Sequence, residues 1–271
     1  MELQDEIASK IGKNRFVLRA VLDSIRLALR VITLPIIRDI HPWTTPEKNQ
    51  GAILPINTEL QQEDLLLPMQ VASEFIERSS YRMIMDVCGC RKAYSCKHHS
   101  PEVGCLFMGE SVLDISGGLG RMVSKAEAQE HLQNAVAQGL VPVTSKVRID
   151  NFMFNIPDRG KLLTLCFCCH CCCMSSFYKD LPAEYLNQVV RPIRGLTIEV
   201  GDECVGCGAC LDYCIFGAIS IVQGKAVHSS TCRGCGRCAT RCPEKAVGMS
   251  LDNPNVKDEI VSHISTYVDV T

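Results

Sequence analysis

The alternation of apolar and polar side chains predicts both helices and strands. Over residues 14–34, polar side chains recur every three or four positions, as on an amphipathic helix. The polar stripe consists of Arg15, Arg19, Asp23, Arg26 and Arg30, and the apolar face of Phe16, Val17, Ala20, Val21, Ile25, Ala28 and Ile32. Because a charge recurs at every turn, the segment is not a membrane span. We favour packing of its apolar face on the chain's own core or on a partner over contact with a membrane surface.

Shorter patterns follow. Pro35, Pro42 and Pro46 break the helical pattern, and residues 35–58 are expected to form an irregular, Pro-rich connection. A helix is expected after Pro68, and the alternation over residues 81–87 predicts a strand that leads directly to Cys88. The buried side of this helix should carry Val71, Ala72, Phe75 and Ile76.

A second helix and a strand pair are expected further along the chain. Ser124 and Glu127 form a capping-box pattern, and Gly139 is the kind of residue at which such a helix ends. Residues 140–156 then read as a strand, a Pro-Asp-Arg-Gly sequence as a turn, and residues 161–167 as the returning strand. A short helix should follow Pro182. A tail helix after Asn253 should place on one side Val256, Ile260, Ile264 and Val268.

The composition narrows the class of protein. The chain has 271 residues, is 46% hydrophobic and carries a net charge of −2, as is typical of an ordinary soluble protein. It shows no excess of basic residues of the kind that nucleic-acid binding requires. It contains 18 cysteines, and its first residues lack the basic and apolar segments of a secretory signal. We therefore expect a reducing, cytoplasmic location and metal ligation by cysteine in place of disulfides.

Eight of the cysteines form two runs of identical spacing, C-x2-C-x2-C-x3-C. The second run begins 28 residues after the first, at Cys232 against Cys204. Three cysteines two residues apart let a tight loop reach three corners of a cubane, and nearby glycines let backbone amides approach the sulfurs. Two structural zinc sites are the alternative, which the repeated x3-C endings disfavour.

The double run resembles the bacterial-type ferredoxin domain, which holds two 4Fe-4S cubanes and in which the fourth cysteine of each run binds the other cluster. Pro243 matches the pattern, whereas Ile215 stands where the first half often has proline. The resemblance implies a small pseudo-twofold domain over residues 196–250. It assigns to cluster I Cys204, Cys207, Cys210 and Cys242, and to cluster II Cys232, Cys235, Cys238 and Cys214.

Ten cysteines remain outside the double run, at the ends of two expected strands. They are Cys88, Cys90, Cys96 and Cys105, and then Cys166, Cys168, Cys169, Cys171, Cys172 and Cys173. If the second set were an extended strand, Cys166, Cys168 and Cys172 would share one face with His170, and the other three would lie on the opposite face. Either the backbone bends sharply or these cysteines serve two centres.

A further iron-sulfur centre is the interpretation we favour for these ten cysteines, because the chain already carries a ferredoxin pattern and thiolates suit iron. A zinc site built from the first four is the alternative. His98, His99 and His170 are candidate ligands or proton donors, or ordinary surface residues. The adjacent cysteines resemble the segments that hold non-cubane clusters in heterodisulfide-reductase-like proteins. The whole pattern is similar to cysteine-rich, ferredoxin-like iron-sulfur proteins of anaerobes.

Together these patterns predict an α+β protein in which a larger, mixed α/β cysteine-rich domain precedes the ferredoxin domain. The expected parts are residues 1–58, 59–190, 196–250 and a helical tail at 251–271. We expect two 4Fe-4S clusters, with one or two additional iron-sulfur clusters, that relay electrons as a subunit or partner of an anaerobic oxidoreductase. The alternatives are a reductase whose centre at residues 166–173 is itself catalytic, and a metal-delivery or activation protein. No phosphate loop or dinucleotide fingerprint is present.

Overall fold

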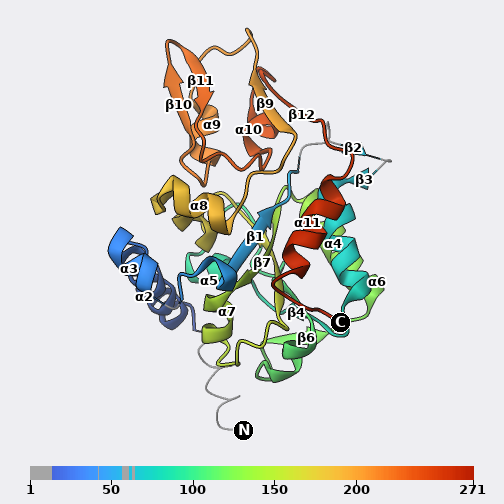
Figure 1. Ribbon diagram of the computed structural model, residues 1–271. Coiled ribbons are helices and arrows are strands. Elements are labelled where there is room, and N and C mark those ends of the chain that lie inside the picture. Colours follow the sequence, from blue (N-terminus) through green and yellow to red (C-terminus); the bar gives the residue numbers. More distant parts are fainter. Residues whose placement is uncertain (1–13, 42, 57–60, 63–64) are drawn as a thin grey trace.

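The computed structural model describes residues 14–271 apart from 42, 57–60 and 63–64 (Figure 1). Its centre is a six-stranded antiparallel sheet in the order β1-β7-β8-β5-β4-β6. In that order the strands are Asn49–Ile53, Val141–Val147, Leu163–Cys168, Leu106–Met108, Arg82–Met85 and Gly120–Met122. A short pair, β2 (Gln61–Gln62) and β3 (Leu65–Leu66), lies apart from this sheet. The protein therefore mixes helices and strands, as the sequence predicts.

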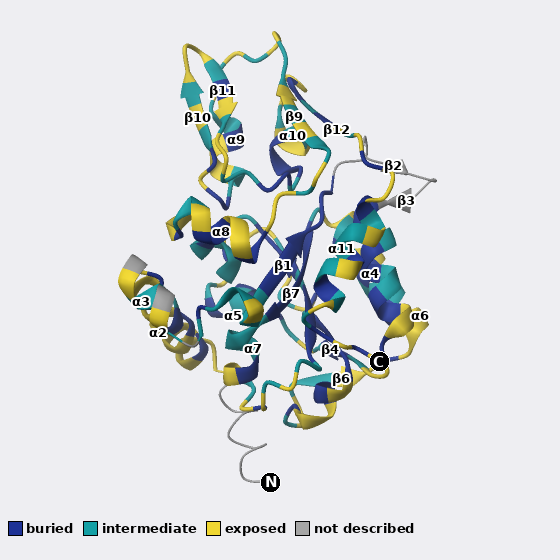
Figure 2. Ribbon diagram, viewed as in Figure 1, coloured by how far each residue is buried: buried dark blue, intermediate teal, exposed yellow. Residues whose placement is uncertain are grey.

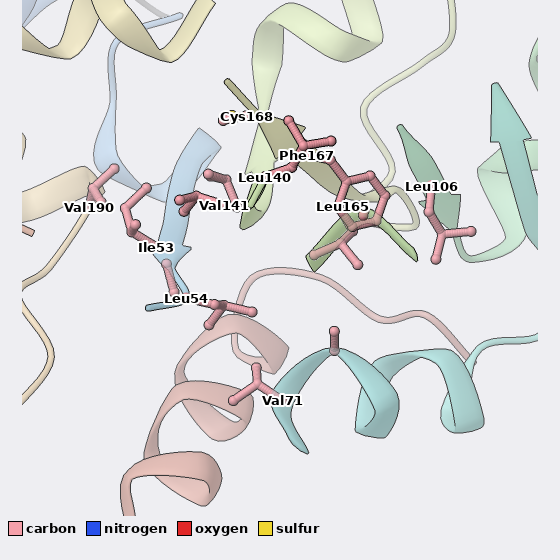
Figure 3. Close-up of a cluster of buried hydrophobic side chains, with 14 of the residues drawn as sticks. Ile53, Leu54, Val71, Leu106, Leu140, Val141, Leu165, Phe167, Cys168 and Val190 are labelled. Atoms are coloured by element: carbon pink, nitrogen blue, oxygen red, sulfur yellow. The ribbon is translucent and has the colours of Figure 1, made fainter. Parts of the chain in front are cut away.

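Three helices lie together along one side of the sheet and enclose the main core; buried residues gather between these helices and the sheet (Figures 1 and 2). They are α4 (Leu67–Arg78), α6 (Lys125–Ala137) and α11 (Val256–Ser265). Figure 3 shows Val71 of α4 close to Leu54, with the side chains of β7 and β8 on the sheet above. Full burial of a large aliphatic side chain contributes roughly 1.5–3 kcal/mol, so this core fixes the sheet that carries the cysteines.

The helices with a strong local pattern form as expected. In α4, Val71, Ala72, Phe75 and Ile76 are all buried. The capping box of α6 is present, because Ser124 accepts a hydrogen bond from the Glu127 amide and the Glu127 carboxylate accepts one from the Ser124 amide. In the tail, Val256 and Ile264 are buried and Ile260 is half-buried, and Val268 is buried beyond the end of the helix.

Two stretches differ from the prediction. Residues 35–56 are not irregular throughout, because they contain α3 (Pro35–Ile40), the 3-10 turn η1 (Pro46–Lys48) and β1; the rest of the expected connection lies outside the described residues. The strand predicted over 140–156 ends at Val147 and is followed by α7 (Arg148–Met153). Both β1 and β7 are held by long-range pairing with each other, which no local pattern reveals. The returning strand is confirmed as β8, with Val141 opposite Cys168.

The first helix, α2 (Arg15–Ile32), is present but turned from the orientation that its sequence suggests. Leu18, Leu22 and Ile25 are buried, whereas Phe16 is 70% exposed and Val17 40% exposed. α2 packs against α5 (Gly89–Ala93) and the 3-10 helix η4 (Met174–Asp180). Of the polar stripe, Arg26 is half-buried and donates to the Cys173 carbonyl and Ser176, whereas Arg30 pairs with Asp180 and stays 61% exposed. No helix among the described residues combines the length and apolarity that crossing a bilayer requires.

A smaller unit at the top of Figure 1 follows α8 (Ala183–Val189), which comes after η4 and Pro182, as the sequence predicts. The turn η3 (Glu110–Asp114) lies between β5 and β6 of the sheet. The smaller unit contains two strand pairs, β9 (Leu196–Val200) with β12 (Val247–Leu251) and β10 (Ile219–Val222) with β11 (Lys225–His228). It also contains two short helices, α9 (Ala209–Tyr213) and α10 (Arg237–Arg241).

Candidate metal centres

The two cysteine runs adopt matching loops in the smaller unit. Each run passes through a glycine that precedes a short helix, Gly208 before α9 and Gly236 before α10. Their φ angles are 77° and 83°, in the left-handed region that glycine enters without a steric penalty. The two glycines are 28 residues apart, like the two cysteine runs, so the repeat in the sequence is also a repeat in backbone conformation.

The structure brings the eight cysteines of these runs together as two sets of four. Burial raises the pKa of Cys210, and the neighbouring charges of Cys204, Cys207 and Cys242 raise it further. In the second set, burial raises the pKa of Cys238 to about 12, with contributions from Cys235, Cys232 and Cys214. The fourth cysteine of each run therefore lies beside the first three of the other run. These are the groupings that the resemblance assigns to clusters I and II.

Backbone amides donate hydrogen bonds to the sulfurs of both sets. The amide of Ala218 lies 3.3 Å from Cys214 Sγ, and the amide of Ala246 lies 3.3 Å from Cys242 Sγ. The amides of Ala226 and Gly234 approach Cys204 and Cys232 in the same way, each at 3.4 Å. Such bonds stabilise negative charge on sulfur, which suits thiolate ligands and tunes the potential of a cluster.

The two sets differ in their surroundings. Cys214, Cys232 and Cys235 pack against the main core of the protein, whereas Cys207, in the other set, is exposed. At this contact the Ile56 amide donates to the Cys235 carbonyl at 3.2 Å. One set therefore lies at the junction with the sheet domain, and the other at the far end of the smaller unit.

Two buried arginines fasten this junction. Arg233 is 2% exposed and donates to the Val190 carbonyl at 2.6 Å and to Asn187 Oδ1 at 2.7 Å, both at the end of α8. Arg237 is 4% exposed and donates to the Cys168 carbonyl at the end of β8. Both arginines lie between cysteines of the second run. Along this run, the residues that hold the junction therefore alternate with the cysteines.

The ten remaining cysteines separate into two groups. The six-cysteine group consists of Cys88, Cys90, Cys105, Cys166, Cys168 and Cys173, and the four-cysteine group of Cys96, Cys169, Cys171 and Cys172. The separation arises because β8 ends at Cys168 and the chain then turns. Strand alternation therefore does not extend to residues 169–173. The chain bends sharply there, and the cysteines fall into two spatial groups.

The six-cysteine group lies at one end of the sheet, where the end of β4, the start of β5 and the end of β8 are neighbours. Cys105 and Cys166 lie 3.3 Å apart, Sγ to Sγ, and Cys168 and Cys173 lie 2.8 Å apart. Cys88 contacts Cys105, and Cys90, at the start of α5, contacts Cys173. These thiols are buried or half-buried, where a thiolate requires a cation to offset the loss of water.

The four-cysteine group is more compact. Its four sulfurs all lie within 4.8 Å of one another, with Cys171 Sγ 3.5 Å from Cys96, 3.9 Å from Cys169 and 3.4 Å from Cys172. In a tetrahedral site with metal–sulfur bonds of about 2.3 Å, the sulfurs are about 3.8 Å apart. The group thus has the donors and the spacing of a four-thiolate metal site.

Arg91 is buried between these two groups. It is 1% exposed and donates to the carbonyls of Ser100, Val103 and Phe167. Burial by itself would lower its pKa, but the charges of Cys88 and Cys169, one from each group, raise it above the usual value. A buried guanidinium without a carboxylate partner is unfavourable, so negative charge on the cysteines around it would stabilise it.

The histidines singled out in the sequence gather beside the four-cysteine group. His98 and His170 have ring nitrogens within 4.8 Å of each other and of Cys171 Sγ. The His170 ring lies 4.6 Å from the ring of Tyr213, centroid to centroid, and Tyr213 directly precedes Cys214. This ring pair connects the four-cysteine group to the inner cysteine set of the smaller unit.

A large cavity opens beside the six-cysteine group. Its volume is about 1220 Å³, and its walls include Leu22 of α2, Trp43, Phe107 and the thiols of Cys88, Cys90, Cys105 and Cys166. Ligand cavities in proteins are usually about 300–1,000 Å³ and mostly apolar. The six-cysteine group therefore forms part of the wall of a large, mostly apolar cavity.

Several residues at these centres are not evident from the sequence. Arg91 follows the C-x-C motif, which is a local signal, but its burial depends on carbonyls from distant parts of the chain. From the sequence alone, we would expect Arg233, Arg237 and Tyr213 to be surface residues of a small domain. Their contacts with the rest of the protein are evident only in the tertiary structure. For those three, no pattern in the chain itself identifies the role.

Comparison with known proteins identifies the smaller unit. Residues 203–246 match the family model of the 4Fe-4S dicluster domain. An uncharacterized ferredoxin of Methanocaldococcus jannaschii is 36% identical over 63 residues, which are 21% of this chain and 82% of that protein. The PorD subunit of pyruvate synthase from Methanothermobacter marburgensis is 38% identical over 51 residues, 19% of this chain and 60% of that subunit. No solved structure matches the chain.

Proposed function

Because this chain belongs, through its 4Fe-4S dicluster domain, to the ferredoxin family, we propose that it relays electrons from cluster I through cluster II to metal centres in the sheet domain. Cluster I is held by Cys204, Cys207, Cys210 and Cys242, and cluster II by Cys232, Cys235, Cys238 and Cys214. The clusters supply one-electron chemistry when bound, and the protein positions them, excludes water and tunes their potentials. In this proposal the two halves are related by a pseudo-twofold axis.

The observation that carries the proposal is the position of the inner cysteine set against the sheet domain. Cys214, Cys232 and Cys235 pack on the same core as Cys168, Cys169, Cys172 and Cys173. The exposed Cys207 lies in the other set. Electron transfer slows steeply with distance, so electrons enter at the exposed cluster I and leave through cluster II.

The receiving centres are built from the two N-terminal cysteine groups. We assign a further iron-sulfur cluster to the six-cysteine group, whose thiols are more widely distributed. The four-cysteine group is a second centre, and its sulfur spacing fits a single tetrahedral ion, zinc or iron. Arg91 offsets negative charge on both.

Metal analysis tests this assignment. Protein purified without oxygen is expected to contain more iron and acid-labile sulfide per chain than the two ferredoxin cubanes hold, because ten further cysteines are available. The Cys169→Ser, Cys171→Ser variant should lose metal from the four-cysteine group and keep both ferredoxin EPR signals.

The control for this measurement is Cys207→Ser, which should disturb cluster I and leave the N-terminal metal in place. Iron that only fills two cubanes, accompanied by one zinc ion, would contradict the N-terminal iron-sulfur cluster. Simultaneous loss of every signal in the double variant would indicate a folding defect in place of a local loss of metal.

The relative from pyruvate synthase and the surface of α2 and α3 support the role of a subunit or partner of an anaerobic oxidoreductase. Ile36 and Ile40 of α3 are 82% and 79% exposed, and Leu27 of α2 is 66% exposed. Because these apolar residues belong to two consecutive helices, we assign the partner contact to this side of the molecule.

The 1220 Å³ cavity favours a second function, that of a reductase for an apolar molecule that reaches the six-cysteine group. In that case a small quinone should reoxidise the reduced protein, and Val21→Trp should slow this step because Val21 lines the cavity. Leu27→Trp on the exposed side of the same helix is the matched control. Equal rates in both variants would leave the relay as the better description.

A further inference from the structure

A second, smaller cavity lies where the dicluster domain meets the turn after β8. Its volume is about 190 Å³, roughly six times the 30 Å³ that one water molecule occupies in the liquid. The polar residues that line it are His99, His170, Tyr213, Arg237, Thr240 and Arg241, and no aspartate or glutamate is among the described residues of its wall. The cavity thus collects donors and positive charge without a carboxylate to neutralise them.

Arg237 is the strongest indication that this cavity takes a ligand. One of its terminal nitrogens donates to the Cys168 carbonyl, while the other, Nη1, is buried and has no hydrogen-bond partner among the described residues. The residue is only 4% exposed. An unmatched buried donor on a charged group is strongly unfavourable, so an acceptor at this position would stabilise the protein.

The other basic groups surround the same space. Arg241 is exposed, and its guanidinium carbon lies 5.3 Å from the centre of the Tyr213 ring, which places this arginine at the rim. With two arginines and no carboxylate among the described residues of its wall, the cavity has a positive potential without any charge on its imidazoles.

We propose that this cavity binds a small inorganic oxyanion, held by Arg237 at its base and Arg241 at its rim. Planar guanidinium groups match the geometry of an oxyanion, and each bond gains strength because the donor is charged. The volume suits a compact tetrahedral ion and excludes a nucleotide. Because His170 also lies against Cys171, the anion would sit beside the four-cysteine group, at the junction that cluster II faces.

Isothermal titration calorimetry on the full-length, anaerobically purified protein tests the site. At low ionic strength, sulfate or phosphate should bind. Arg241→Gln should weaken binding of the preferred ion about tenfold or more, as expected for loss of a charged hydrogen bond. Arg237→Gln should abolish binding.

The matched control is Arg159→Gln, which removes the same charge from a surface arginine paired with Asp114 and should bind normally. Arg241 is exposed, so its variant remains informative even if Arg237→Gln does not fold. The site is overturned if neither sulfate nor phosphate binds at millimolar concentration, or if Arg241→Gln and Arg159→Gln behave alike.

Discussion

Replacing Arg91 with glutamine is expected to lower the free energy of unfolding by about 3–5 kcal/mol, the usual cost of leaving a buried charge network incomplete. It should also empty the metal centres that we propose for the N-terminal cysteine groups. The guanidinium is 1% exposed and ties the loop that carries Cys96 and Cys105 to β8 through the carbonyls of Ser100, Val103 and Phe167. Glutamine can replace one of these bonds and supplies no charge to offset the thiolates. Denaturant unfolding and metal analysis measure the two effects.

Two further variants separate the causes. Arg91→Lys keeps the charge but cannot reproduce three directed bonds, so it should recover part of the metal and little of the stability. Arg121→Gln, at an exposed arginine paired with Glu127, should cost less than about 1 kcal/mol. If Arg91→Gln retained its full metal content and its unfolding midpoint, Arg91 would have no role as a counter-charge to the thiolate groups.

The parts of the fold that follow correctly from the sequence are those encoded by neighbouring residues. The capping box at Ser124 and Glu127, the apolar side of α4 and the tail helix each depend on contacts within a few positions, and each is present. The dicluster domain belongs to the same class, because eight cysteines at repeated spacing leave little freedom for the loops between them. Its family is therefore evident from the spacing of its cysteines alone.

The features that escape prediction depend on partners far along the chain. β1 forms because it pairs with β7. The orientation of α2 depends on Arg26, which donates hydrogen bonds to the Cys173 carbonyl and to Ser176. The partition of the ten cysteines follows from the turn after Cys168, which alternation along a strand cannot anticipate. Ligands from separate strands converge only after the sheet has formed, so their grouping is a property of the tertiary structure.

Replacing Arg233 with leucine is expected to undock the dicluster domain and interrupt the proposed electron relay while both clusters of that domain remain. Arg233 is 2% exposed and bonds to Val190 and Asn187 of the sheet domain. Hydrogen bonds to a charged group contribute about 1.5–3 kcal/mol each, so losing two weakens docking by about 3 kcal/mol or more. The distance between cluster II and the N-terminal centres then increases.

Freeze-quench EPR after rapid reduction should show clusters I and II reduced at the normal rate in Arg233→Leu and the N-terminal signal delayed by about tenfold or more, because electron transfer slows steeply with distance. Hydrogen exchange should accelerate over residues 190–195, where the two domains join. Lys225→Met is the matched control, because Lys225 forms an ion pair with Asp202 inside the dicluster domain, away from the junction. An unchanged N-terminal reduction rate in Arg233→Leu, together with faster exchange, would mean that electrons reach those centres by a route that does not pass through the docked cluster II.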